Sequence, residues 1–227
     1  MSNPNYIKTI YDVKKTPLTA YPSILIRHLI SKYKIPKNSS VLDLGCGRGE
    51  FLNEFINNDM EGHGVDFSDF AIEYCPKAKI SVIDIEKEKI PYPDNTFDVV
   101  YSKSFVEHFY YPDKIFDEAY RVLKPGGTII TLTPEWPYIY KSFFEDFTHR
   151  TPFTNLSLRN IQEMSGFKDI KIESFKQLPV IFENNFFSKF FGFFSFLTRV
   201  LVPENFRMKN KWIRFSKEIM LLSVSRK

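Results

Sequence analysis

The chain has 227 residues, which is enough to bury a substantial core and fits one domain. Hydrophobic residues make up 43% of it and charged residues 26%, a balance typical of a soluble globular protein. The formal net charge of +4 is too small to indicate a nucleic-acid partner by itself. No run of about 20 apolar residues predicts a membrane-spanning helix.

The two cysteines, Cys46 and Cys75, lack the spacing of metal ligands and do not indicate a disulfide framework. Residues 1–16 are polar and contain no apolar segment of the kind found in signal peptides. We therefore expect a protein of a reducing compartment, the cytoplasm, with contact at the inner membrane surface as an alternative discussed below.

An N-terminal arm is followed by a predicted helix over 21–33, which leads into a buried strand over 40–44. Glycines follow that strand in the turn 45–49. The next segment, 50–58, is predicted to be helical because its apolar side chains share one face: Phe51, Leu52, Phe55 and Ile56.

Short apolar runs and helical patterns alternate along the rest of the chain. Strands are predicted over 62–66, 79–84, 97–102, 127–133, 168–175 and 218–225, and helices over 113–123 and 156–165. Strands that alternate with helices at this spacing form βαβ units. The sequence therefore predicts an α/β fold with a parallel sheet.

The glycine-rich turn is the sharpest local motif. A buried strand runs into Gly45, Gly47 and Gly49, where a ligand can approach the backbone with no Cβ in the way. The spacing is G-x-G-x-G and not the dinucleotide pattern G-x-G-x-x-G, and Asp43 stands two residues before the first glycine. A carboxylate would repel a pyrophosphate but suits the ammonium of an amino acid. The turn therefore favours an amino-acid nucleoside, with a plain structural turn as the alternative.

Two more acidic residues follow the next two predicted strands. Asp66 ends the second strand, 23 residues after Asp43, which is the ordinary place for a carboxylate that binds ribose hydroxyls. Asp84 ends the third strand, where it could accept a hydrogen bond from an adenine amino group. Three acidic residues at successive strand ends are unusual in an unrelated α/β protein.

Residues 41–133 resemble the class I S-adenosylmethionine-dependent methyltransferases. The resemblance rests on VLDLGCGRGEF (41–51), VDFS (65–68), IDIEKEKIPYPDNTFDVVYS (83–102), VEHF (106–109) and RVLKPGGTIITLTP (121–134). It implies a doubly wound, Rossmann-like α/β fold. The sheet would have seven mostly parallel strands, helices on both faces and an antiparallel last strand. A Phe-rich helical insertion precedes that last strand.

The resemblance also implies S-adenosylmethionine as cofactor and assigns residues to it. Asp43 and the loop would hold its methionine end, Asp66 its ribose, and Asp84 with the Ile85 backbone its adenine. The remaining residues expected around the cofactor are Gly45, Cys46 and Gly47 in the loop, Phe67 against the adenine, and Ser102 and Phe105 near the sulfonium.

Methyl transfer from a sulfonium is an in-line displacement, so the protein mainly aligns the reactants and excludes water. A hydroxyl acceptor benefits from a general base, and histidine is the usual one near neutral pH. His108 follows the fourth strand, at the cofactor edge of the sheet. His149, which we expect to act as the base or to bind the acceptor, lies in a loop over the same edge, three residues after Asp146, which could orient its imidazole. Histidines that only tie down the loops are the structural alternative, and no metal site is expected.

The segment from Phe182 to Phe196 contains eight of the 24 Phe residues of the chain. A basic run follows: Arg207, Lys209, Lys211, Arg214 and Lys217. Three interpretations remain open for the region 182–217. Its Phe residues pack inward in a lid over the acceptor site, dip into a membrane whose anionic headgroups meet the basic residues, or form a dimer interface. Nucleic-acid binding is not expected, because the aromatic residues precede the basic ones and do not alternate with them.

We expect one methyltransferase domain over 1–227, as a monomer or a homodimer. Its parts are an N-terminal arm and helix (1–36), a cofactor-binding core (37–135), an acceptor-side loop, helix and strand (136–178), the Phe-rich basic insertion (179–216) and the last strand (217–227).

The leading hypothesis is O-methylation of a small or carrier-linked acceptor such as a sugar, with a histidine as general base. Alternatives are N- or C-methylation of a lipid or quinone-like acceptor and a catalytically silent cofactor-binding module. A nicotinamide-dependent oxidoreductase is disfavoured by the glycine spacing and by Asp43.

Overall fold

The computed structural model describes residues 17–183, 186–204, 206 and 210–227. Residues 1–16 of the predicted N-terminal arm and Arg207 and Lys209 of the basic run lie outside this part. Seven strands form one sheet in the order β3-β2-β1-β4-β5-β7-β6. They are β1 (Ser40–Leu44), β2 (Glu61–Asp66), β3 (Lys79–Val82), β4 (Phe97–Lys103), β5 (Leu123–Pro134), β6 (Lys168–Lys176) and β7 (Ile219–Arg226).

The sheet is mixed. β1 pairs in parallel with β2 and β4, β2 with β3, and β4 with β5, whereas β7 pairs antiparallel with both β5 and β6. Six strands therefore share one direction and the last strand opposes them. This confirms the seven expected strands and the Rossmann-like architecture.

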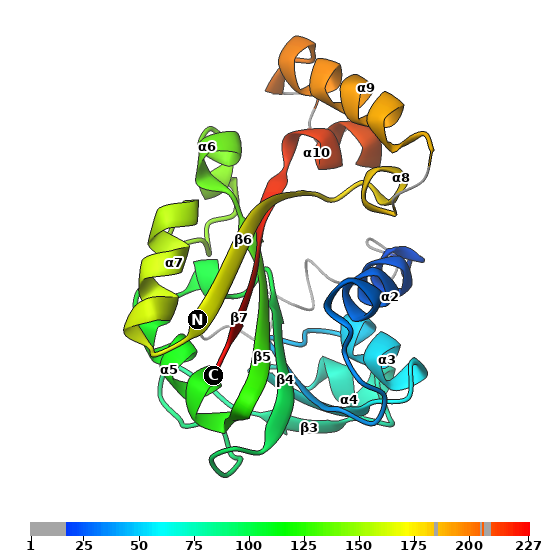
Figure 1. The fold of residues 1–227 in the computed structure, drawn as a ribbon. Helices are drawn as coiled ribbons and strands as arrows, with labels where there is room; N and C mark the ends of the chain where they lie inside the picture. The colour runs from blue at the N-terminus through cyan, green and yellow to red at the C-terminus, as the bar shows by residue number, and fades with distance from the viewer. Residues whose placement is uncertain (1–16, 184–185, 205, 207–209) are drawn as a thin grey trace.

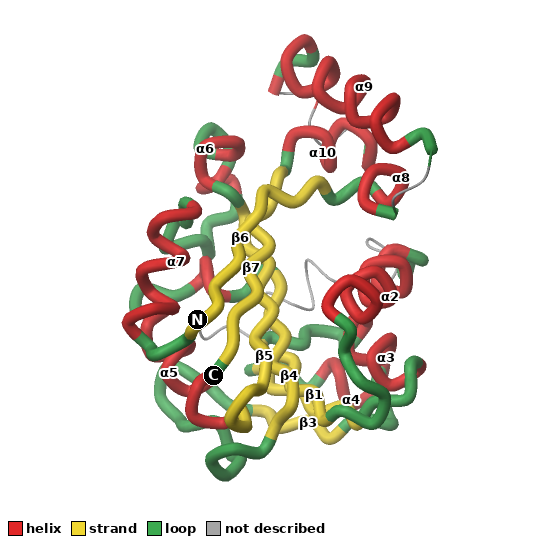
Figure 2. The backbone as a smooth tube through the Cα atoms, viewed as in Figure 1, coloured by secondary structure: helices red, strands yellow, loops and turns green. Residues whose placement is uncertain are grey.

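Helices cover both faces of the sheet (Figures 1 and 2). One face carries α2 (Tyr21–Tyr33), α3 (Glu50–Asn57) and α4 (Phe70–Tyr74), and the other carries α5 (Pro112–Val122) and α7 (Asn155–Met164). The remaining short helices are α6 (Trp136–Ile139), α8 (Pro179–Phe182) and α10 (Lys211–Lys217), with 3-10 turns η1 (Val106–His108) and η2 (Phe143–Glu145). The longest helix of the insertion is α9 (Ser188–Leu201).

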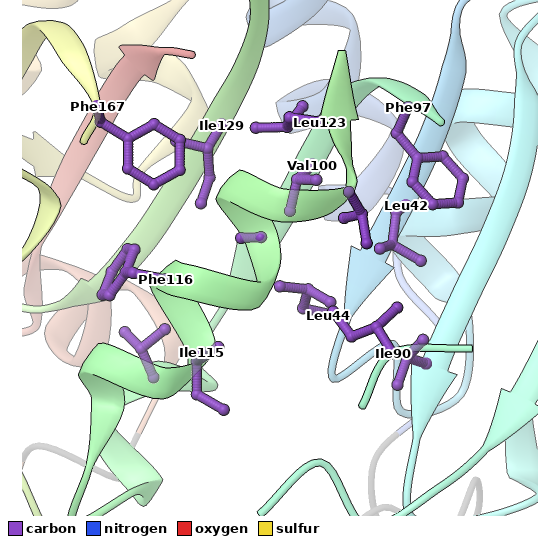
Figure 3. Close-up of a cluster of buried hydrophobic side chains, with 14 of the residues drawn as sticks. Leu42, Leu44, Ile90, Phe97, Val100, Ile115, Phe116, Leu123, Ile129 and Phe167 are labelled. Atoms are coloured by element: carbon purple, nitrogen blue, oxygen red, sulfur yellow. The ribbon is translucent and has the colours of Figure 1, made fainter. Parts of the chain in front are cut away.

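The α5 face of the sheet is sealed by residues at helical spacing on α5. Four of its side chains are buried against β1, β4 and β5: Ile115, Phe116, Ala119 and Val122. In Figure 3, Ile115 and Phe116 lie against a layer of strand side chains that includes Leu42, Val100 and Ile129. This pattern is the one that predicted the helix.

The opposite face is closed by α2 and α3. Leu25 and Leu29 of α2 are fully buried, as is Phe55 of α3. The ring of Phe55 lies 5.3 Å from that of Tyr101 on β4, edge to face. These contacts fix α3 on the sheet, and α3 begins directly after the glycine turn.

Several elements differ from the sequence prediction; β3, for example, ends at Val82 and not at Asp84. β5 begins at Leu123 and not at 127, because Leu123 pairs with Phe97 before an irregularity that brings Thr128 opposite Val99. The Pro-Gly-Gly sequence therefore interrupts the strand and does not precede it. The short helix α4 was not predicted, since five residues are too few to show a helical repeat and only Ala71 among them is buried.

The insertion stands at the carboxyl edge of the sheet. β6 runs parallel to the central strands and ends at Lys176, and β7 starts back from the same edge at Ile219. The helices between them, α8 to α10, therefore extend beyond this edge (Figure 2). The carboxyl edge is also where open α/β sheets bind ligands.

Removing the aromatic contact under α3 should weaken the fold. We expect Phe55→Ala to lower the free energy of unfolding by about 3–5 kcal/mol, because it leaves a cavity between α3 and β4. Urea unfolding followed by circular dichroism measures this. Phe193→Ala on the exposed side of α9 is the matched control and should change stability by less than about 0.5 kcal/mol. Equal effects would contradict the packing described.

Candidate active site

A pocket opens at the carboxyl edge where β1 and β4, which are distant in sequence, lie side by side. This is the topological switch point of the sheet. The pocket is lined by Gly45, Gly47, Val65, Asp66, Phe67, Ile83, Asp84, Ile85, Glu86, Ser104, Phe105, His108 and Phe109. Eight of these were predicted from the sequence, seven for the cofactor and His108 for the chemistry.

The glycine turn needs its glycines. Gly45 and Gly47 have φ values of +73° and +54°, which residues with a side chain rarely adopt. A Cβ on Gly45 would lie 2.1 Å from the ring of Phe105, whereas one on Gly47 would meet no atom within 4 Å. The N–H groups of Gly45 and Cys46 donate to the Val65 carbonyl and so tie the turn to β2. Backbone therefore faces the pocket directly at this turn.

Asp66 joins the turn to the end of β2. Its Oδ2 accepts from the Gly47 N–H at 2.8 Å, and its Oδ1 accepts from the N–H and hydroxyl of Ser68 at 2.9 and 2.8 Å. Burial raises the pKa of this carboxyl above its usual range, although these hydrogen bonds oppose the shift. Asp66 also lines the pocket, where its carboxylate is a hydrogen-bond acceptor for a ligand hydroxyl.

Asp84 and Ile85 line the pocket as predicted, but Asp84 does not end its strand. β3 ends at Val82, and Asp84 instead opens a turn in which its Oδ1 accepts from the Glu86 N–H. Its Oδ2 forms an ion pair with Lys87 at 2.7 Å. Burial raises the pKa of Asp84, but the bond from Lys87 and the Glu86 N–H outweigh it and leave the pKa below the usual range.

Three residues expected beside the cofactor lie beneath the pocket and do not line it. Asp43 is 3% exposed, and burial followed by the neighbouring Asp66 raises its pKa to about 8. Cys46 is buried with its sulfur toward Gly64. Ser102 is buried on β4 opposite Leu44, and the pocket is lined instead by Ser104, which has a φ of +52°. The backbone turn after β4 that exposes Ser104 has no sequence motif.

On the acceptor side, Asp146 reaches His108 through Thr148. The Thr148 N–H and hydroxyl donate to Oδ1 of Asp146, and the same hydroxyl oxygen lies 3.0 Å from Nδ1 of His108. Because the single hydroxyl proton goes to the carboxylate, the hydrogen-bond network assigns the Nδ1 proton to His108. His108 also hydrogen-bonds to the backbone carbonyls of Thr148 and Ser104, which raise its pKa against the effect of burial. The sequence predicted Asp146 as the partner of the other histidine.

The imidazole of His149 lies beside that of His108, with ring centroids 4.9 Å apart. Its Nδ1 is 2.6 Å from the Phe143 carbonyl oxygen, which only a protonated Nδ1 can satisfy. Burial lowers the pKa of both histidines, and for His108, with help from nearby His149, the pKa falls to about 4. Both imidazoles are therefore neutral at pH 7, and that of His149 has its lone pair on Nε2.

Glu107 holds the loop that contains Arg150 and Thr151. Its backbone carbonyl accepts from the N–H groups of Arg150 and Thr151, and its buried side chain accepts from the Thr133 hydroxyl at 3.0 Å. Burial raises the pKa of Glu107 to about 7. Ligand atoms of Glu107, His108 and His149 lie within 4.8 Å of one another, so this group could hold a metal ion that the sequence did not predict.

Comparison with known proteins identifies the family. A family model described as a methyltransferase domain matches residues 42–131. An uncharacterized protein of Methanocaldococcus jannaschii is 31% identical over 183 residues, which cover 79% of this chain and 76% of that protein. The chain belongs to the class I S-adenosylmethionine-dependent methyltransferase family.

Other members of this methyltransferase family match smaller parts or only the fold. Phosphoethanolamine N-methyltransferase 3 of Arabidopsis thaliana is 34% identical over 115 residues, 46% of this chain, and the match spans only 23% of that enzyme. The crystal structure of a SAM-dependent methyltransferase from Archaeoglobus fulgidus superimposes with a TM-score of 0.65 at 23% identity, over 98% of this chain and 99% of that one.

The pocket fits the cofactor of the family, S-adenosylmethionine. Two glycines present bare backbone at one end, and two carboxylates, Asp66 and Asp84, line the other part of the cavity. Hydroxyl and amino groups of an adenosyl amino acid are donors that carboxylates accept. Because Asp66 is buried, its hydrogen bonds are strong, and removal of its carboxylate should cost binding free energy.

Asp66 should therefore determine cofactor affinity. We expect Asp66→Ala to raise the dissociation constant of S-adenosylhomocysteine about 10- to 100-fold, because both the ligand bonds and the tether of the glycine turn are lost. Isothermal titration calorimetry on folded protein, verified by circular dichroism, measures the change. Asp69→Ala, at an exposed residue three positions on, should leave affinity unchanged. A similar loss in both variants would contradict the assignment.

The buried Asp43 carboxyl should make the fold less stable at alkaline pH. Its pKa is about 8 when folded against 3.8 ordinarily, so its protonated form stabilises the fold below the lower value. That stabilisation disappears as pH rises through the higher value. From about pH 5 to about pH 8, the wild type should lose stability relative to Asp43→Asn by up to about 1.4 kcal/mol per pH unit. Urea unfolding at several pH values measures this, and parallel curves would refute it.

Proposed function

We propose that the pocket binds S-adenosylmethionine with its ribose on Asp66 and its adenine between Phe67 and the Asp84–Ile85 turn. The methionine end would lie over Gly45 and Gly47, with the Phe105 ring closing the sulfonium side. Asp43, Cys46 and Ser102 would support this arrangement from below, as positioning residues. The placement rests on which side chains line the pocket and which hydrogen bonds hold them.

We propose that the chain methylates a hydroxyl group of a small or carrier-linked acceptor such as a sugar. The observation that carries this proposal is the pair of neutral imidazoles at the pocket, His108 and His149, each of which can accept a proton. The bound cofactor supplies an electrophilic methyl group. An amine acceptor needs no such base, whereas a hydroxyl benefits from one.

In this proposal His108 takes the proton. It lines the pocket, and the Thr148 hydroxyl and Asp146 carboxylate hold its ring and would stabilise the imidazolium that forms. The acceptor oxygen bonds to the methyl carbon, the carbon–sulfur bond breaks with its electron pair left on sulfur, and the acceptor proton moves to the imidazole of His108. His149 would bind or orient the acceptor from the adjacent loop.

An alternative proposal is N- or C-methylation of a lipid or quinone-like acceptor. The identity with a plant phosphoethanolamine N-methyltransferase favours it, over the part of the chain that the match covers. Detection of methylated product by mass spectrometry, first on sugar and carrier-linked hydroxyls and then on amines and quinols, discriminates between these acceptors. A silent module would bind the cofactor and methylate none of them.

Once an acceptor is found, the imidazole pair can be tested by substitution. We expect His108→Ala and His149→Ala each to lower kcat by roughly two orders of magnitude, because proton removal or acceptor alignment is lost. His149 lies outside the pocket lining, so His149→Ala should keep the affinity for S-adenosylhomocysteine. Thr148→Val should lower kcat less, by about tenfold, since it only breaks the link to Asp146.

His28→Ala is the matched control, because His28 packs against Phe182 on the far face and should leave kcat unchanged. The assays contain a chelator. Activity that disappears under chelation and returns with a divalent ion would assign Glu107, His108 and His149 to a metal and contradict a free imidazole base. Unchanged kcat in both histidine variants would remove the pair from the mechanism.

A further inference from the structure

The outward face of α9 is apolar along its whole length. Its large side chains are exposed where a soluble helix would carry polar ones: Phe190, Phe193, Phe194, Phe196, Val200 and Leu201. The exposed fraction reaches 58% for Phe190 and 71% for Leu201. Spaced at 3.6 residues per turn, these residues cover about half of the helix circumference.

The polar side of α9 faces the protein. Ser195 is buried, and the Thr198 hydroxyl accepts from the Trp212 indole N–H of α10 at 3.0 Å. Phe191 lies on the same side, with its ring 6.1 Å from that of Trp212. The helix is therefore docked on α10 in an orientation that turns all of its phenylalanines except Phe191 away from the rest of the chain. The interpretation as a lid with inward-facing Phe residues is wrong for this orientation.

Basic residues flank the apolar face. α9 carries Lys189 and Arg199, and α10 carries Lys211, Arg214 and Lys217. Arg214 pairs with Glu218 and the buried Lys217 with Glu204, which leaves Lys189 and Lys211 to meet a surface. Lys189 and Lys211 are exposed. A positive rim around an apolar face complements a surface of anionic headgroups over acyl chains. A two-fold dimer through the same face would bring like charges together.

We propose that the exposed face of α9 docks on an anionic lipid membrane. None of the helices in the described part of the chain is long and apolar enough to cross a bilayer. With 14 residues, α9 is about 21 Å long, which is shorter than the hydrocarbon core. The helix therefore lies in the plane of the interface, with its aromatic face below the headgroups and Lys189 and Lys211 among them.

The docking surface continues toward the acceptor side of the active site. The Arg199 guanidinium lies 5.0 Å from the ring of Tyr138 in α6, and the Tyr138 side chain is itself exposed. Exposed Tyr140 and Phe144 follow in the segment that leads to His149. In Figure 1, α9 is the outermost element of the insertion and α6 rises at the same end of the molecule. Docking by α9 therefore brings the acceptor side of the pocket close to the lipid surface.

Vesicle co-sedimentation of the full chain tests this proposal without any need for an acceptor. We expect binding to phosphatidylcholine vesicles that contain phosphatidylglycerol, weaker binding to pure phosphatidylcholine, and loss of the difference at high salt. Phe193→Ser/Phe196→Ser should reduce the partition coefficient about tenfold or more, because two aromatic rings no longer leave water. Lys189→Gln/Lys211→Gln should reduce binding only to the anionic vesicles.

Leu156→Ser/Met164→Ser is the matched control, because both residues are exposed on α7 and lie away from α9. It should bind vesicles as the wild type does. Absence of sedimentation with anionic vesicles would overturn the proposal. A different result would also overturn it: light scattering shows that the wild type is a dimer and the Phe193→Ser/Phe196→Ser variant is a monomer, and the wild type does not sediment with vesicles. Cofactor affinity, measured in parallel, should be equal in all variants and keeps this test separate from the methyltransferase function.

Discussion

The architecture of the site depends on one carboxylate that ties two loops together. Asp66 accepts hydrogen bonds from the Gly47 N–H on the first loop and from Ser68 on the second. Strand pairing brings β1 and β2 side by side, but it does not by itself determine the path of the glycine turn beyond Leu44. The Asp66 bonds do so together with the Val65 carbonyl, which accepts from the N–H groups of Gly45 and Cys46. The turn leaves bare backbone facing the cavity in which Phe105, Asp84 and His108 converge.

The loop from Asp146 to Thr151 is attached to the cofactor pocket through a second set of polar contacts. Glu107 holds the loop of Arg150 and Thr151 with its backbone carbonyl, and Thr148 links Asp146 to His108. The cofactor pocket and the imidazole pair therefore meet at the short turn η1. Since α9 lies outside both, the three proposed tasks of holding the cofactor, preparing the acceptor and meeting a membrane would fall to separate parts of the chain.

Features that depend on local periodicity could be predicted from the sequence, and features that depend on tertiary orientation could not. The seven strands, α5 and the pocket residues Gly45 and Asp66 follow from repeats and strand ends, whereas Asp84 lines the pocket from a turn beyond the end of β3. Ser104 could not be foreseen in place of Ser102, because the turn after β4 changes which side chain faces the cavity. The link from Asp146 to His108 needs Thr148, a contact across 40 residues. The Phe-rich insertion was predicted to be helical, but its sequence could not reveal which way the helix faces.

Binding of an adenosyl amino acid by the glycine turn and its carboxylates is the central claim, and calorimetry on the wild-type chain tests it most directly. Titration with S-adenosylhomocysteine should give saturable heat at one site per chain, and titration with NADH should give none. Saturable heat with the dinucleotide and no heat with the nucleoside would contradict the account.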